Sequence, residues 1–221
     1  MTRRRFRVKA MVGLCLVSFI FVLMRMFFWS FPLYRDEGAY AYWAWMMTQG
    51  GRVYVDIFEI KPPGALPILV GGMSLFGWDL LGLRLFSTVW GIITLGCFVM
   101  VGWRVLRNLR GALVCAVGAA VFLVDPSVWG HSIMLETIFL VPVLAAIWLL
   151  HGAVGKPSCC GFGGAGLLLG YAVWIKQTAV FWGGILPLWA LWQMRRRHRF
   201  AAWKCGFWYV AAGLVLSLFW L

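Results

Sequence analysis

Long apolar runs dominate the sequence and limit what the chain can fold into. Charged or turn-forming residues separate seven such runs, which cover 10–33, 80–106, 111–124, 133–150, 162–175, 179–192 and 200–221. Hydrophobic residues make up 63% of the chain and charged residues only 12%, a balance that a soluble domain of 221 residues does not have. A helix of about 20 apolar residues crosses a bilayer. The sequence therefore predicts an all-α polytopic membrane protein with about seven transmembrane helices in a single transmembrane domain, 1–221.

The basic residues are distributed as in a membrane protein, although a net charge of +13 in a soluble protein would suggest nucleic acid. Fourteen of the 20 Lys and Arg residues lie on one predicted side, in 3–9, 104–110, 195–204 and at Lys156. The positive-inside rule places that side in the cytoplasm. We therefore expect a multi-pass protein of the cell (inner) membrane with a cytoplasmic N-terminus and no nucleic-acid partner. The acids gather on or near the periplasmic or extracellular face, which indicates a site there.

One polar stretch, 34–64, forms the first outer loop and holds four of the seven carboxylates. Asp36 is expected to cap a short interfacial helix that ends near Thr48, before Gly50-Gly51. Residues 52–57 alternate like a short extended segment, and Pro62-Pro63 restarts the chain as a helix. This arrangement would bring Asp36 and Glu37 close to Glu59 and Lys61 at one membrane surface.

Arg25 interrupts the first apolar run and has two interpretations. Its side chain either extends along the helix to the membrane interface, which is the commoner behaviour, or faces an internal polar cavity. The run at 65–76 is expected to be a helix of about 18 Å, which is too short to cross a hydrocarbon core of about 30 Å.

An ordered set of motifs within this frame resembles one enzyme family. The set comprises Asp36-Glu37-Gly38, Gly51-Arg52-Val53-Tyr54-Val55-Asp56, Lys61-Pro62-Pro63-Gly64, Phe76-Gly77 and Arg84-Leu85. It resembles the family 39-type glycosyltransferases of the GT-C fold, which include the protein O-mannosyltransferases and the aminoarabinose transferases that modify lipid A. The resemblance covers the whole chain in topology and 36–85 in motif.

The resemblance implies a membrane enzyme that transfers a sugar from a polyprenyl-phosphate carrier to a lipid or protein acceptor on the non-cytoplasmic face. Asp36, with Glu37 beside it, matches the family's catalytic carboxylate, which would take the acceptor's proton. Lys61 matches the family's phosphate-contacting lysine, and Arg35 and Arg84 are candidates to assist it. The alternatives are a helix cap for the two acids and an interfacial anchor for Lys61.

Three further acids, Glu59, Asp56 and Glu136, are candidates for contact with a metal or the acceptor. Glu59 resembles a metal-associated glutamate before Lys-Pro-Pro, but Ile60 intervenes here. His131 precedes Glu136 and is either a metal ligand or a structural histidine. No cofactor is certain, and a divalent metal ion of unknown identity is left open.

Enzymes of the resembled family are usually considerably longer than this chain. We therefore expect a truncated chain that forms the N-terminal part of a GT-C-like transmembrane domain. The alternative function is a non-catalytic membrane module that binds a lipid carrier or a partner subunit.

Overall fold

A computed structural model describes residues 3–57, 61–195 and 199–217. Its regular structure is helical in all the described parts, apart from one isolated bridge between Val53 and Ile57. The chain divides into two compact units. The first unit comprises Met1–Ile60 and Ala65–Ile138, and the second comprises Lys61–Gly64 and Phe139–Leu221. The expected all-α class is therefore confirmed.

A helix forms in each of the seven apolar runs. These helices are α1 (Arg3–Met26), α4 (Leu80–Leu106), α5 (Leu109–Phe122), α6 (Leu135–Gly155), α7 (Cys159–Ile175), α8 (Val180–Arg195) and α9 (Arg199–Ser217). Among the described residues, three helical segments are long and apolar enough to cross a membrane, namely 8–26, 80–106 and 135–155. The multi-pass membrane class is thus supported, while the number of seven crossings stays a prediction.

Polar side chains begin several helices by accepting hydrogen bonds from backbone amides that the first turn leaves unpaired. The Asp79 carboxylate accepts from the Gly82 amide at 2.7 Å and starts α4. Asn108 and Ser158 cap α5 and α7 in the same way. These caps explain why α4, α5 and α7 begin close to the first residues of their apolar runs.

Two further helices lie between α1 and α4. They are α2 (Arg35–Thr48) and α3 (Leu66–Phe76), and a 3₁₀ turn at Pro63–Ala65 precedes the second. Gly50, with a φ of +85°, terminates α2 as expected. The start of α2 differs from the prediction, because Tyr34 is the N-cap and Asp36 lies inside the first turn.

The 52–57 segment is a compact turn, so the expectation of an extended segment is wrong. The Asp56 carboxylate accepts hydrogen bonds from the Arg52 amide at 2.9 Å and from Arg52 Nε at 3.1 Å. Tyr54 has a φ of +68°, which an extended residue does not have. The local ion pair therefore closes the chain on itself. Because a carboxylate that accepts hydrogen bonds is stabilised in its charged form, the pKa of Asp56 is lowered, mainly by the Arg52 amide.

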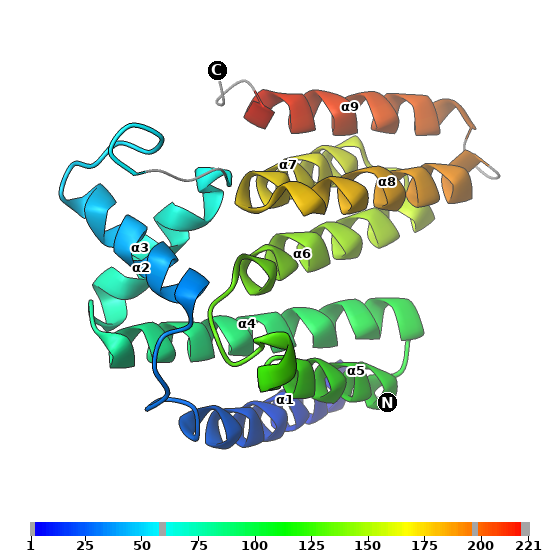
Figure 1. The fold of residues 1–221 in the computed structure, drawn as a ribbon. Coiled ribbons are helices and arrows are strands. Elements are labelled where there is room, and N and C mark those ends of the chain that lie inside the picture. The colour runs from blue at the N-terminus through cyan, green and yellow to red at the C-terminus, as the bar shows by residue number, and fades with distance from the viewer. Residues whose placement is uncertain (1–2, 58–60, 196–198, 218–221) are drawn as a thin grey trace. The chain divides into compact units, whose positions relative to one another are not determined.

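In the first unit, α1, α4 and α5 pack against one another (Figure 1). Phe21 of α1, Leu95 of α4 and Leu123 at the end of α5 share one buried apolar cluster. The helices α2 and α3 also contact each other, and α3 contacts α4. Burial of such side chains is the main favourable contribution to packing in the interior of a helical domain.

In the second unit, α7 packs closely against α9 and both contact α8 (Figure 1). A Cβ at Gly166 would lie 2.3 Å from the backbone oxygen of Tyr209, so only glycine allows this approach of α7 to α9. The Tyr209 hydroxyl donates to the Gly183 carbonyl of α8 at 2.6 Å. Small residues at the interface therefore bring these helices together, as is common in membrane proteins.

Candidate active site

The first turn of α2 carries three of the predicted site residues, and their exposures differ. Arg35 is exposed, Asp36 is half-buried and Glu37 is completely buried, with 0% of its surface exposed. Acids in the first turn of a helix are favoured by its dipole. Glu37 also accepts a weak hydrogen bond from the Tyr34 amide at 3.4 Å, which satisfies one of the free donors at the helix start.

Glu37 forms an ion pair with Arg84 of α4, which is only 1% exposed. Arg84 Nη1 lies 2.5 Å from Glu37 Oε1. The same carboxylate oxygen accepts a hydrogen bond from the Ile133 amide at 3.1 Å. A buried ion pair offsets its desolvation only when further hydrogen bonds satisfy its groups. Glu37 meets this condition, whereas Arg84 Nε is buried without a partner among the described residues. The pair thus fastens α2 to α4 and to the segment before α6.

The other end of the Arg84 guanidinium holds the chain that leads into α2. Arg84 Nη2 donates to the Phe31 carbonyl at 3.2 Å and to the Pro32 carbonyl at 3.4 Å. Arg84 therefore binds both the α2 carboxylate and the backbone just before α2. This network fixes the position of the turn that bears Asp36.

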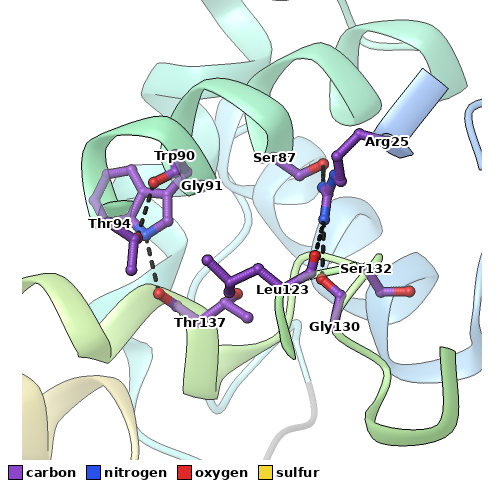
Figure 2. A pocket seen from close by; sticks show the side chains of 9 residues that line it. All are labelled: Arg25, Ser87, Trp90, Gly91, Thr94, Leu123, Gly130, Ser132 and Thr137. Atoms are coloured by element: carbon purple, nitrogen blue, oxygen red, sulfur yellow. Dashed lines mark hydrogen bonds between the residues drawn. The ribbon is translucent and has the colours of Figure 1, made fainter. Parts of the chain in front are cut away.

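A second buried arginine, Arg25 of α1, lies in the same unit and is 3% exposed. Arg25 Nη1 donates to the carbonyl oxygens of Leu123 and Gly130 at 3.0 and 2.9 Å, and Nη2 donates to Ser87 Oγ (Figure 2). Ser87 donates in turn to the Arg84 carbonyl at 3.0 Å. The more common interpretation of Arg25, extension to the membrane interface, is therefore wrong, and the side chain faces a polar interior.

A small cavity adjoins Arg25. Its volume is about 10 Å³, close to the room that one water molecule requires. Figure 2 shows the residues that line it, which are Arg25, Ser87, Trp90, Gly91, Thr94, Leu123, Gly130, Ser132 and Thr137. Ser132 Oγ is buried and has no hydrogen-bond partner among the described residues. Because neither a sugar nor a lipid phosphate fits such a volume, this cavity is not a substrate pocket.

His131 is buried in the α5–α6 connection and its ring packs against aromatic rings of the first unit. Its ring lies 5.0 Å from that of Phe28, and its Nδ1 has no partner among the described residues. Burial lowers the pKa of His131, and the nearby positive charge of Arg84 lowers it further. Both effects favour the neutral imidazole, which suits a ring packed against the Phe28 ring.

The remaining predicted acids, Asp56, Glu136 and Glu59, lie in other parts of the chain. Asp56 is exposed and paired with Arg52, and Glu136 is exposed in the first turn of α6. Glu59 lies outside the described residues. Among the residues that are described, no three His, Cys, Asp or Glu side chains come together as a metal site would require.

Lys61 belongs to the second unit, where the segment 61–64 is fastened to α7. The Tyr171 hydroxyl donates to the Gly64 carbonyl at 2.8 Å. A Cβ at Gly64 would lie 2.7 Å from the backbone of Trp174, so the segment lies directly on the helix. Lys61 itself is half-buried, and the adjacent Pro62 and Pro63 restrict its backbone. Lys61 thus occupies a defined position within its unit.

Sequence reasoning identified Glu37 and Arg84 but missed that they pair with each other. It also missed Ser87, Ser132 and the backbone carbonyls that bind Arg25. The usable signal was that both arginines lie within apolar runs, where a charge needs an internal partner. Their partners are separated from them by 47 to 105 residues in the sequence and carry no local pattern.

Comparison with known families agrees with this fold. The family model described as dolichyl-phosphate-mannose-protein mannosyltransferase matches residues 60–221. The match contains Lys61-Pro62-Pro63-Gly64 and Arg84-Leu85, while Asp36 and Glu37 precede it. No curated protein matches the chain. Because the match covers well over half of its length, the chain belongs to the dolichyl-phosphate-mannose-protein mannosyltransferase family, whose members are membrane glycosyltransferases of the GT-C type.

Proposed function

We propose that the protein transfers a sugar from a polyprenyl-phosphate carrier to a lipid or protein acceptor on the non-cytoplasmic face of the cell (inner) membrane. The observation that carries this proposal is the difference in burial between two adjacent carboxylates in the first turn of α2. Glu37 is buried and bound to Arg84, while its neighbour Asp36 is half-buried. A family of glycosyltransferases needs a carboxylate that is fixed in position and still accessible to an acceptor, and Asp36 fits that description.

Asp36 would act as the general base. Attack on the anomeric carbon requires removal of a proton from the acceptor's hydroxyl or amine, and a positioned carboxylate can take it. Glu37 is fully engaged by Arg84 and the Ile133 amide, so its role is to hold the turn. Asp36 is then the base, and Glu37 is a positioning residue.

Lys61 would contact the carrier phosphate. A cation that meets the growing negative charge on the leaving phosphate lowers the barrier to its departure. The fixed geometry of 61–64 on α7 supports this role, because an interfacial anchor needs no such constraint. Arg35 is exposed and remains a candidate helper, whereas the Arg84 guanidinium is already bound to Glu37 and to two carbonyl groups.

The test is a transfer assay in membranes with a set of polyprenyl-phosphate sugars. Asp36→Asn should lower the rate by about 10²- to 10⁴-fold and leave carrier binding largely intact. Because the N-cap of α2 is Tyr34, the amide leaves the cap residue in place, and loss of the first-turn charge should cost the helix about 1 kcal/mol or less. Asp79→Asn is the matched control, since this carboxylate only caps α4.

Two outcomes would contradict the proposal. Transfer by Asp36→Asn at the wild-type rate would remove Asp36 from the chemistry. Carrier binding by the wild type without any transfer would support the alternative of a non-catalytic membrane module.

A further inference from the structure

Arg25 makes its hydrogen bonds to two different elements. Nη2 donates to Ser87 of α4, and Nη1 donates to both Leu123 and Gly130 of the α5–α6 loop, residues 123–134. Leu123 lies at the beginning of this loop and Gly130 near its end. One guanidinium therefore binds the loop at two points seven residues apart and holds it against α1 and α4.

The α5–α6 loop is tightly closed between these two points. The Gly130 amide donates to the Asp125 carbonyl at 2.9 Å, and a Cβ at Gly130 would collide with the Phe122 carbonyl oxygen. Ser127 donates its amide to the Asp125 carboxylate at 2.8 Å. Little freedom is left in the loop once Arg25 is in place.

Three residues after Gly130, the same loop reaches the candidate site. The Ile133 amide donates to Glu37 Oε1, the oxygen that Arg84 also binds. The connection thus runs from Arg25 to Gly130, through the backbone to Ile133, and on to the first turn of α2. Asp36 directly precedes Glu37 in that turn.

The charges of the first unit make Arg25 a costly choice for packing alone. Arg25 and Arg84 are both buried, and Glu37 is the one carboxylate buried with them among the described residues. Each hydrogen-bond partner of Arg25 is neutral. An apolar side chain at position 25 would avoid the desolvation of a buried guanidinium, which is energetically costly when no carboxylate pairs with it. Such a cost indicates a geometric requirement that only a multidentate donor meets.

We propose that Arg25 is a positioning residue of the active site. It fixes the α5–α6 loop so that the Ile133 amide holds Glu37, and thereby fixes the first turn of α2, where Asp36 lies. The effect on catalysis rests on the function proposed above, whereas the effect on the loop and on α2 does not.

The first test measures hydrogen exchange of the full chain in detergent or nanodiscs, without any substrate. Arg25→Gln should raise exchange about tenfold or more in peptides that cover 130–134 and 35–39, because a charge-assisted clamp is lost. Peptides from α7 and α8 should keep their wild-type exchange. Ser18→Ala is the control, since Ser18 lies two turns earlier on α1 and its hydroxyl has no partner among the described residues.

The second test is kinetic and uses Arg25→Lys. A lysine keeps the charge but cannot reach Ser87 and both carbonyl groups as the forked guanidinium does. The expected result is a loss of about 10- to 100-fold in kcat with an unchanged KM for the carrier, because a small displacement of a catalytic group lowers the rate without weakening binding.

Each other outcome overturns the proposal. Faster exchange at 130–134 with unchanged exchange at 35–39 would limit Arg25 to the loop. A uniform rise in both units would indicate general destabilisation, and full kcat in Arg25→Lys would show that charge alone suffices. The exchange results remain decisive even if the wild type transfers no sugar, so failure of this proposal is distinguishable from failure of the proposed function.

Discussion

The two units of the chain differ in the kinds of side chain that they bury. Every buried polar or charged side chain among the described residues lies in the first unit, including Arg25, Glu37 and Arg84. The buried side chains described in the second unit are apolar, and many are alanines, such as Ala165, Ala172 and Ala190. The first unit thus adds paired polar groups to its apolar core, whereas the buried side chains described in the second are apolar.

This difference bears on where function is located. Close packing of small residues stabilises a helix pair but brings no reactive group to a surface. A buried polar network fixes the direction of each side chain, at the expense of desolvation, and so suits a region that must hold a catalytic group. The first unit therefore has the polar network that the proposed role of Asp36 requires, while the second holds the segment that carries Lys61 against α7.

The largest expected effect tests the dependence of the first unit on pairing. Arg84→Met leaves the Glu37 carboxylate buried without its cation and should destabilise the protein by about 3–5 kcal/mol. Glu37→Gln should be destabilising for the converse reason. The double variant should lose less than the sum of the two single losses by about 0.5–3 kcal/mol, because the partners are removed together.

Unfolding in detergent, followed by circular dichroism, measures all three variants. Strictly additive losses would show that the 2.5 Å contact between Arg84 and Glu37 carries no coupling. Pairing of buried polar groups would then not contribute to the stability of the first unit.

A smaller effect is expected where the second unit depends on shape. Gly166→Ala places a methyl group against the Tyr209 carbonyl oxygen and should destabilise the protein by about 1–3 kcal/mol. Gly184→Ala of α8 is the matched control, because its Cβ would meet nothing within 4 Å. Alanine favours a helix over glycine by about 1 kcal/mol, so the control should raise the melting temperature. Equal melting temperatures for the two variants would contradict close packing of α7 and α9.

The sequence predicted the helices well and the site incompletely, for physical reasons. Helix α4 spans Leu80–Leu106, as the apolar run 80–106 indicates, because hydropathy and the Asp79 cap are local properties. The N-cap of α2 was misplaced at Asp36, since Asp and Ser are commoner caps than Tyr34. Here the Glu37 side chain accepts from the Tyr34 amide, so the acid in the first turn bonds back to the cap residue.

The inward orientation of Arg25 could not be read from its neighbours in the sequence. An arginine in an apolar helix extends to the interface unless a folded loop offers it acceptors. Those acceptors are backbone carbonyl groups of Leu123 and Gly130, which any residue type provides. The pairing of Glu37 with Arg84 is similarly a property of the folded chain, because each residue alone is compatible with several partners.

The smallest expected effect separates stability from function within the second unit. Tyr171→Phe removes the hydroxyl that binds the Gly64 carbonyl, and Tyr209→Phe removes the one that binds Gly183. Each should destabilise the protein by about 1 kcal/mol, the usual net contribution of a hydrogen bond. The two variants are therefore matched in chemistry and in their expected loss of stability.

Their effects on carrier binding should differ. Loss of the Tyr171 hydroxyl loosens the segment 61–64, so Tyr171→Phe should weaken carrier binding severalfold, less than the roughly 10- to 100-fold expected for Lys61→Ala from loss of a charge-assisted contact. Tyr209→Phe should bind the carrier like the wild type, because Gly183 lies in α8 and not in that segment. Binding of a polyprenyl phosphate to the purified protein decides between these results. Equal affinity in the two tyrosine variants would mean that the fixed geometry of 61–64 does not serve the phosphate, and Lys61 would then be an interfacial anchor.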